Sequence, residues 1–274
     1  MGLTNRGKLF SATTAAALMI AGAASAITLN ITVTNNQADG GFAVTPLYTG
    51  IHDGTFDAFT VGEAASAGVE SIAETGSAAL VAGERTAVDA DSFGAVIASP
   101  DGPPPIEAGE TVSTQIEIDT DSALYLTYLS MLLPSNDTFI GNDDPTAIQL
   151  FGDDGAFLGP QTIEVTGADI YDAGTEANAL FGSAFVAGED IALGGPGEGL
   201  ITAGTDLSVF AGAELATGAI LGSADQLDFL SNPAAFSLLT ITVSEVAPVP
   251  LPASALLLLT GLGGIAVSRR RRKA

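Results

Sequence analysis

The chain has 274 residues, no cysteine and a formal net charge of −24. The lack of cysteine excludes disulfides and thiol catalysis, and the acidic balance excludes nucleic acid as a partner, because phosphate contacts need Lys and Arg. All 32 acidic residues lie between Asp39 and Glu245, where Arg85 is the single basic residue, so residues 27–247 carry a net charge of −31.

The first 26 residues predict an export signal peptide. Arg6 and Lys8 give it a positively charged start, an apolar and small-residue stretch follows, and Ala-Ser-Ala at 24–26 fits a cleavage site. A membrane-spanning helix is the alternative, but this apolar stretch is short and rich in alanine. We therefore expect the mature chain to begin near Ile27 and to be exported.

From residue 27 onward the hydrophobic pattern is that of short strands. In ITLNITVTN at 27–35, apolar residues alternate with Thr and Asn, as in a strand with one buried face. The run ALYLTYLSMLL at 123–133 is apolar on both faces and predicts a central strand. Further segments with strand-like alternation are 111–119, 236–244 and parts of 206–210.

One segment between these strands predicts a helix. It is EAASAGVESIAE at 63–74, where Ala65, Val69 and Ile72 have helical spacing. Turns rich in Gly, Pro and Asp separate the strands, the chain shows no internal repeat, and no break divides it into two domains. We therefore predict one all-β domain over 27–247, built as an antiparallel β-sandwich or barrel.

The last 27 residues, 248–274, predict a membrane-directed tail. An apolar segment at 251–267 is followed by basic residues at 269–273. At about 1.5 Å per residue this segment reaches roughly 26 Å, the lower limit for a helix that crosses the hydrocarbon core. The basic cluster would stay on the cytoplasmic side, which leaves residues 27–247 outside the cytoplasmic membrane.

A proline motif at the start of the apolar segment makes this tail more specific. It consists of Val249, Pro250, Leu251, Pro252 and Ala253. The order of motif, short apolar helix and arginine cluster resembles the bacterial PEP-CTERM family of sorting tails in its VPLPA variant, although Leu251 stands where that family usually has Glu. The resemblance implies processing by an exosortase-type membrane protease, so that a membrane-anchored intermediate precedes display at the cell surface or release. A plain C-terminal anchor is the alternative.

The stretch PSNDTFIGNDDPTA at 134–147 gathers oxygen ligands directly after the predicted central strand. It contains Asp137, Asp143 and Asp144 and no basic residue. One interpretation is a solvated polar loop, which we expect for Asp143 and Asp144. The other interpretation is a site for a hard cation.

Three motifs resemble the spondin domain, an extracellular module. They are GIHDGTFD at 50–57, PSNDTFIGND at 134–143 and YDAGTE at 171–176. The similarity extends over about residues 28–245. The resemblance implies a β-sandwich of two antiparallel sheets, in agreement with the strand pattern.

The same resemblance implies a calcium ion at one edge of the sandwich. The positions that match the family's calcium ligands are Asp137, Asp172 and Glu176, the last standing where the family pattern has Asp. Calcium accepts about six to eight oxygen ligands in loosely constrained geometry, and carboxylates from two loops, positioned by turns at Gly141 and Gly174, would repel one another without it. In the alternative without a metal, Asp137 caps a turn and Asp172 forms an Asx-turn.

Motifs for catalysis are missing from the sequence. His52, the only histidine, lies beside an Asp-Gly turn signal and is expected to be a structural hydrogen-bonding residue. No nucleophile elbow, zinc-protease motif or phosphate loop occurs, and a glycosidase carboxylate pair cannot be singled out in so acidic a chain. We predict a non-enzymatic binding or adhesion module whose partner is an extracellular polysaccharide or matrix component. The alternative is a secreted glycan-active enzyme that uses two carboxylates.

The charge of residues 27–247 generates a first prediction. Because like charges repel in a compact domain and ions screen them, salt and calcium should both stabilise this protein. We expect its melting temperature in differential scanning calorimetry to rise with added NaCl and with added CaCl2. A melting temperature that neither salt changes would contradict this electrostatic view.

Overall fold

The computed structural model describes residues 26–99, 105–118, 123–191, 195, 197 and 199–247. Residues 1–25 of the predicted export signal, the predicted sorting motif from Val249 to Ala253 and the predicted membrane helix lie outside the described residues. Among those described, no helix is both long enough and apolar enough to span a bilayer.

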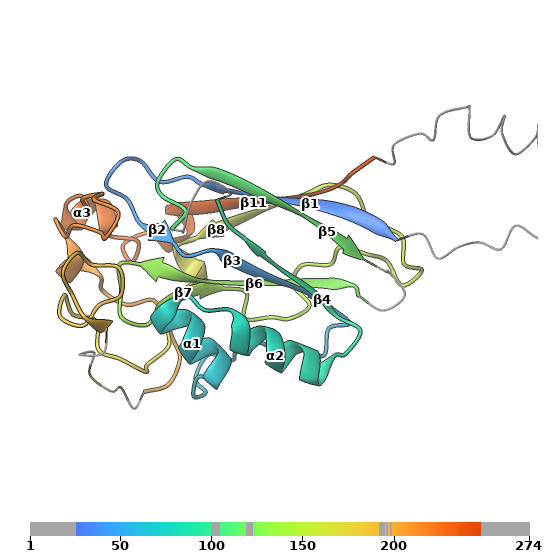
Figure 1. Ribbon diagram of the computed structural model, residues 1–274, viewed down its shortest axis with the longest axis horizontal. Coiled ribbons are helices and arrows are strands. Elements are labelled where there is room, and N and C mark those ends of the chain that lie inside the picture. Colours follow the sequence, from blue (N-terminus) through green and yellow to red (C-terminus); the bar gives the residue numbers. More distant parts are fainter. Residues whose placement is uncertain are drawn as a thin grey trace, which may run out of the picture.

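Two antiparallel β-sheets form the layers of a sandwich, as expected (Figure 1). The first sheet has four strands in the order β5-β1-β11-β8. Their bounds are Thr111–Ile118 for β5, Ile27–Asn35 for β1, Ser237–Glu245 for β11 and Gln161–Thr166 for β8. The two inner strands are therefore the first and the last strand of the described chain.

The second sheet has seven strands and carries most of the loops discussed below. Its order is β10-β9-β7-β6-β3-β4, with β2 paired to β6 beside this path. The bounds are Ala43–Val44 for β2, Leu47–His52 for β3, Phe93–Ile97 for β4, Tyr125–Leu133 for β6, Thr138–Gly141 for β7, Ile170–Asp172 for β9 and Thr202–Ala203 for β10.

Two helices cover the outer face of the second sheet, below it in Figure 1. They are α1, Ala67–Thr75, and α2, Ala79–Val88, and α1 packs against β6 and β7. Helix α1 begins at Ser66, whose Oγ accepts the Val69 N–H at 3.1 Å, and ends at Gly76, whose φ of +71° suits glycine. A third helix, α3, spans Ala224–Leu227.

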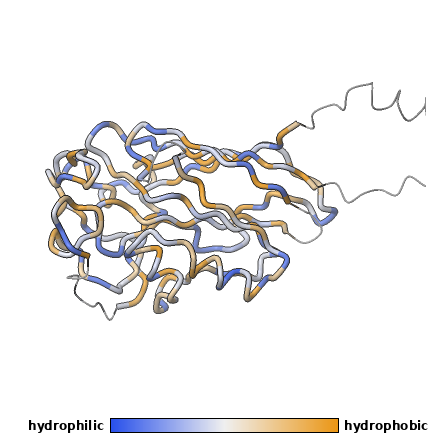
Figure 2. The backbone as a smooth tube through the Cα atoms, in the orientation of Figure 1, coloured by the Kyte–Doolittle hydropathy of each residue, from blue (hydrophilic) through white to orange (hydrophobic). Residues whose placement is uncertain are grey.

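The burial of the strands follows their sequence patterns. Leu29, Ile31 and Val33 of β1 face the core between the sheets, while the residues between them are half-buried. Strand β6 is buried on both faces because the first sheet lies on one side and α1 on the other, where Leu129 packs with Val69. Figure 2 shows hydrophilic residues gathering in the turns and along the helices.

One sequence expectation about secondary structure was wrong, and one helix was not foreseen. The segment 206–210 forms no strand; Ser208–Phe210 closes into a single 3-10 turn that buries only Phe210. Helix α2 was not predicted from the sequence, but the domain is mostly β with few helices, in agreement with the predicted all-β sandwich. The hydrophobic pattern of α2 is weak because only Val81 and Arg85 are buried, and Arg85 is a charged residue.

The two ends of the sandwich contain different parts of the chain. At one end the described chain begins and finishes, since the Val246 N–H donates to Thr28 C=O at 2.8 Å. At the other end the Asn35 amide donates to Phe42 C=O at 2.9 Å, and Ala43 pairs with Leu133. We call this second end the distal end; it includes the turn between β6 and β7.

The buried Arg85 ties α2 to the second sheet. Its Nε donates to the Tyr48 hydroxyl at 2.8 Å and its Nη1 to Ser92 Oγ at 2.5 Å. The side chain lies across Gly50 of β3 and Gly94 of β4, which are paired partners. The absence of side chains at these two positions makes room for the arginine.

This packing generates a second prediction. A Cβ on Gly50 would lie 2.7 Å from Arg85 Cδ, so Gly50→Ala should lower the free energy of unfolding by about 1–3 kcal/mol through overpacking. Gly83→Ala is the matched control, because Gly83 is an exposed α2 residue with open space around it, and this change should add up to about 1 kcal/mol. Urea denaturation measures both; equal shifts of the two midpoints would contradict the packing argument.

Candidate functional site

Asp137 lies in the distal turn between β6 and β7 and is fully buried. Its Oδ2 accepts the backbone N–H groups of Thr175 at 2.8 Å and Glu176 at 2.9 Å, which fastens this turn to the loop after β9. Its Oδ1 is also buried but has no hydrogen-bond partner. A buried carboxylate oxygen without a donor is costly, because water no longer solvates it.

Asp172 lies beside Asp137 because their strands are neighbours. It is the last residue of β9 and pairs with Thr138, and the Ala173 N–H donates to Asp137 C=O at 3.1 Å. Asp172 Oδ1 accepts the Gly174 N–H at 2.9 Å, an Asx-turn, and its Oδ2 accepts the Asn178 amide at 2.9 Å.

Glu176 completes the set of predicted ligands that the fold brings together. Its backbone N–H bonds to Asp137, and its side chain is partly exposed. The Asn136 amide faces the Glu176 carboxylate and favours its charged form, yet Asn136 Nδ2 is buried without hydrogen-bond geometry to any partner. Two buried polar atoms without partners, one on Asp137 and one on Asn136, therefore lie in adjacent residues.

The carboxylates of this cluster repel one another. Burial raises the pKa of Asp137 to about 6, against the lowering effect of the backbone N–H groups, and the charges of Asp172 and Glu74 raise it further. Burial also raises the pKa of Glu176, and Glu74 and Asp137 add to that rise. Glu74 belongs to α1 and is not among the residues predicted from the sequence.

The other polar residues of the 134–147 stretch do not join this cluster. Asp143 and Asp144 are exposed beyond the far end of β7, where Asp143 Oδ1 accepts the Val61 N–H at 3.1 Å and Asp144 Oδ1 the Thr146 N–H at 2.8 Å. Their expected solvation is confirmed. The turn expected at Gly141 was wrong: this glycine ends β7, and a Cβ there would lie 2.8 Å from Phe59 Cε1.

His52 has a structural position, as expected. It is fully buried, its Nε2 is bonded to Thr127 Oγ1 at 2.8 Å, and its Nδ1 accepts the Gly54 N–H at 3.0 Å. Burial lowers the pKa of the ring, so the neutral form is favoured. Both ring nitrogens are thus engaged within the fold.

The geometry of the cluster does not match a cation site, whereas the chemistry of its donor groups does. Within the part of the chain that the structure describes, no three His, Asp or Glu side chains converge closely enough to hold a metal ion. The donor chemistry nevertheless fits a hard cation, because the available groups are carboxylates and the Asp137 Oδ1 is buried without a donor.

An exposed apolar tip is fastened to the same turn. The Asn136 N–H donates to Asn178 Oδ1 at 3.1 Å, and the Ala179 N–H donates to Asn136 Oδ1 at 2.9 Å. The next residues, Leu180 and Phe181, are 41% and 60% exposed. Large apolar side chains that a fixed loop keeps exposed in this way are typical of interaction surfaces.

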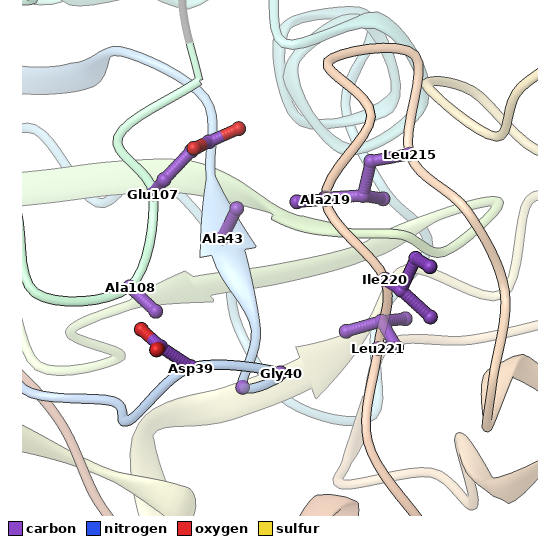
Figure 3. Close-up of a pocket in the computed structure, with 10 residues that line it drawn as sticks. Asp39, Gly40, Ala43, Glu107, Ala108, Leu215, Ala219, Ile220 and Leu221 are labelled. Atoms are coloured by element: carbon purple, nitrogen blue, oxygen red, sulfur yellow. The ribbon is translucent and has the colours of Figure 1, made fainter.

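The distal end also contains a pocket of about 250 Å³ (Figure 3). Asp39 and Glu107 line one side of it, and apolar side chains line the other. The apolar residues are Leu215, Ala219, Ile220 and Leu221. No residue of the Asp137 cluster lines this pocket, so the two features are separate.

Fold and site together define an antiparallel β-sandwich module with a buried acidic cluster in its distal loops. The Spondin_N family model matches residues 41–188, just over half of the chain, and the chain therefore belongs to the Spondin_N family. The match contains all three motifs that carried the resemblance and leaves β1 and β11 outside it. No match was found among curated proteins. Membership of this family indicates a binding module of the extracellular-matrix type.

The buried carboxylate generates a third prediction. The Asp137 pKa of about 6 lies above its ordinary value of 3.8, so the folded state binds an extra proton between these values. Stability therefore falls as the pH rises through this window, by at most about 3 kcal/mol, since one pKa unit corresponds to about 1.4 kcal/mol.

Urea denaturation at pH 5 and pH 7 measures this contribution. Asp137→Asn keeps an oxygen that accepts the Thr175 and Glu176 N–H groups but does not titrate. The wild-type protein should gain stability on going from pH 7 to pH 5 relative to this variant. The same pH dependence in both proteins would contradict the assignment to Asp137.

Proposed function

We propose that this protein is an exported binding or adhesion module, displayed at the cell surface, whose distal loops are ordered by calcium. The observation that carries the proposal is the buried Asp137 Oδ1, which has no donor and lies in a cluster with Asp172 and Glu176. A bound calcium ion would supply the positive charge that this cluster lacks and would hold the two loops together.

The charge balance favours an ion over a metal-free cluster. A carboxyl group with a pKa of about 6 is mostly ionised at pH 7, and residues 27–247 contain a single basic side chain against 32 acidic ones. Calcium is the fitting cation, since the donors are oxygens and its geometry tolerates the longer Glu176.

The position of the cluster supports a role in contacting a partner. The distal loops lie at the opposite end of the sandwich from the described chain ends (Figure 1). If the predicted tail holds the protein at a membrane until an exosortase-type protease acts, these loops face away from that membrane. The exposed Leu180 and Phe181 would then contribute to the surface that meets an extracellular polysaccharide or matrix component.

One observation favours the second candidate, a secreted glycan-active enzyme. A carboxyl group with a pKa near 6, such as Asp137, is suited to act as a general acid. Asp137 is however fully buried, and both backbone donors it binds come from the neighbouring loop. A substrate would need access that this side chain lacks, so we favour binding.

The calcium site generates a fourth prediction. Calorimetric titration of the purified full-length protein with CaCl2 should give a saturable heat, and Asp137→Asn should abolish it. Asp153→Asn is the control, because it removes one acidic charge from an exposed residue outside the cluster. A wild-type titration without saturable heat, or one that Asp137→Asn leaves unchanged, would contradict the site.

Retention assays test the function itself. The wild-type protein should be retained on cells or on immobilised exopolysaccharide when calcium is present and should be released by a chelator. Asp137→Asn should lose this retention and Asp153→Asn should keep it. Hydrolysis of a polysaccharide panel by the purified protein would instead support the enzyme.

A further inference from the structure

We propose that the pocket at the distal end receives an arginine or lysine side chain of a partner protein. Asp39 and Glu107 line one side of this pocket, and the apolar residues of the segment 215–221 line the other (Figure 3). The inference rests on the proposed function, because it names the kind of partner that the binding module meets. It does not involve the Asp137 cluster, of which no residue lines the pocket.

Three segments that are far apart in the chain build the walls of the pocket. The turn between β1 and β2 contains Asp39, the loop before β5 contains Glu107, and the segment 213–221 provides the apolar wall. The Gly222 N–H donates to Gly40 C=O at 2.8 Å, which joins the first of these segments to the third. Hydrogen bonds within the protein therefore fix the walls before a ligand enters.

The apolar wall is itself held in place. The Leu215 N–H donates to Ala219 C=O at 2.7 Å and closes the turn of the segment, and the Ala216 N–H donates to Phe185 C=O at 2.7 Å. The second bond fastens the wall to the loop that follows β9. Ile220 also lines the pocket and is 63% exposed. Part of this fixed wall is thus open to a second molecule.

The carboxylates of Asp39 and Glu107 have no positive partner within the described part of the chain. There, neither side chain accepts a hydrogen bond or forms an ion pair. Arg85, the single basic residue of 27–247, is 5% exposed and is bonded to Tyr48 and Ser92. A cationic group is therefore the complement to this side of the pocket.

The size and the lining of the pocket fit one basic side chain. Its volume of about 250 Å³ lies below the roughly 300–1,000 Å³ of pockets that enclose drug-sized ligands. The residues that line it include no aromatic side chain, so the lining offers no stacking surface to a sugar ring. Arginine and lysine combine an apolar stem with a charged head. The stem matches the wall formed by Leu215 and Leu221, and the head matches the two carboxylates.

The partner is a protein other than a second copy of this domain. Residues 27–247 contain Arg85 as their single basic residue, and it is buried. A free amine would fill the pocket but leave Ile220 exposed, whereas a peptide segment also places an apolar neighbour on Ile220. The net charge of −31 over 27–247 attracts a basic partner and speeds its association.

The fifth prediction concerns the peptide Ala-Leu-Arg-Leu-Ala with blocked ends. Its control contains citrulline, which has the shape of arginine without the charge. In calorimetric titrations in a chelator, the full-length protein should bind the arginine peptide at least about tenfold more tightly, because the citrulline peptide lacks charge-assisted hydrogen bonds. The absence of this preference would overturn the proposal. Butylguanidinium, which has no peptide backbone, should bind more weakly than the arginine peptide; equal binding would assign the pocket to a free amine.

Substitution of the two carboxylates locates the binding. Asp39→Asn combined with Glu107→Gln should weaken binding of the arginine peptide by about tenfold or more and leave the citrulline peptide unaffected. Asp153→Asn combined with Glu117→Gln is the matched control, because it removes the same charges from exposed residues outside the pocket. Equal losses in the two double variants would show attraction by the overall charge and would overturn the site.

A second pair of variants tests the apolar wall. Ile220→Ser should weaken binding of the arginine peptide by about 3- to 10-fold, because apolar contact with the peptide is lost. Leu158→Ser is the control, since Leu158 is 57% exposed and does not line the pocket. A loss with Ile220→Ser no larger than that with Leu158→Ser would overturn the role of this wall.

The Asp137→Asn variant separates this inference from the proposed calcium site. It should lose the calcium heat and still bind the arginine peptide in a chelator. Loss of peptide binding in this variant would place the peptide at the calcium cluster and overturn the pocket. If the wild-type protein shows no saturable calcium binding but prefers the arginine peptide, the calcium site is removed and the pocket stands. If calcium binds and the arginine peptide is not preferred, only the pocket is overturned.

Discussion

Burial of β6 on both faces is the constraint on which the distal site depends. The strand is covered by the first sheet on one side and by α1 on the other, so the turn that follows Leu133 begins inside the protein. Asp137 is four residues further along, and its side chain is fully buried. One of its oxygens is satisfied by the loop after β9, and the other is left without a donor.

The hydrogen bonds that stabilise these loops also bring negative charges close together. The bonds from Asp137 to the Thr175 and Glu176 N–H groups hold two loops together, yet they bring carboxylates near one another in a region where water screens them poorly. Local conflicts of this kind between fold and side-chain chemistry are typical of functional sites. Arg85 is the single basic residue of 27–247. It fastens α2 across two glycines of the sheet and therefore does not neutralise the cluster.

The ends of the described chain and the acidic cluster lie at opposite ends of the sandwich. The first and last described strands lie side by side at the centre of one sheet, so residues 27 and 245 lie at the same end. The acidic cluster, the Leu180–Phe181 tip and the pocket beside Asp39 gather at the other end. Asn136 connects the first two of these features, since it bonds to Asn178 and Ala179 on one side and precedes Asp137 on the other.

The sequence by itself determined the elements whose pattern is local. Alternation predicted β1, β5 and β11, the doubly apolar run predicted β6, and helical spacing predicted α1; the three motifs led to the family and to Asp137, Asp172 and Glu176. Only the tertiary structure decided which charged side chains lie close together. Glu74 is distant in sequence and lies in an ordinary helical segment, so only the packing of α1 on β6 and β7 brings it to Asp137. Helix α2 escaped prediction because its buried face is completed by a charged residue, Arg85, for which the sheet leaves room at Gly50 and Gly94. The burial of a side chain and the charges around it depend on residues far apart in the chain, so a local sequence pattern does not predict them.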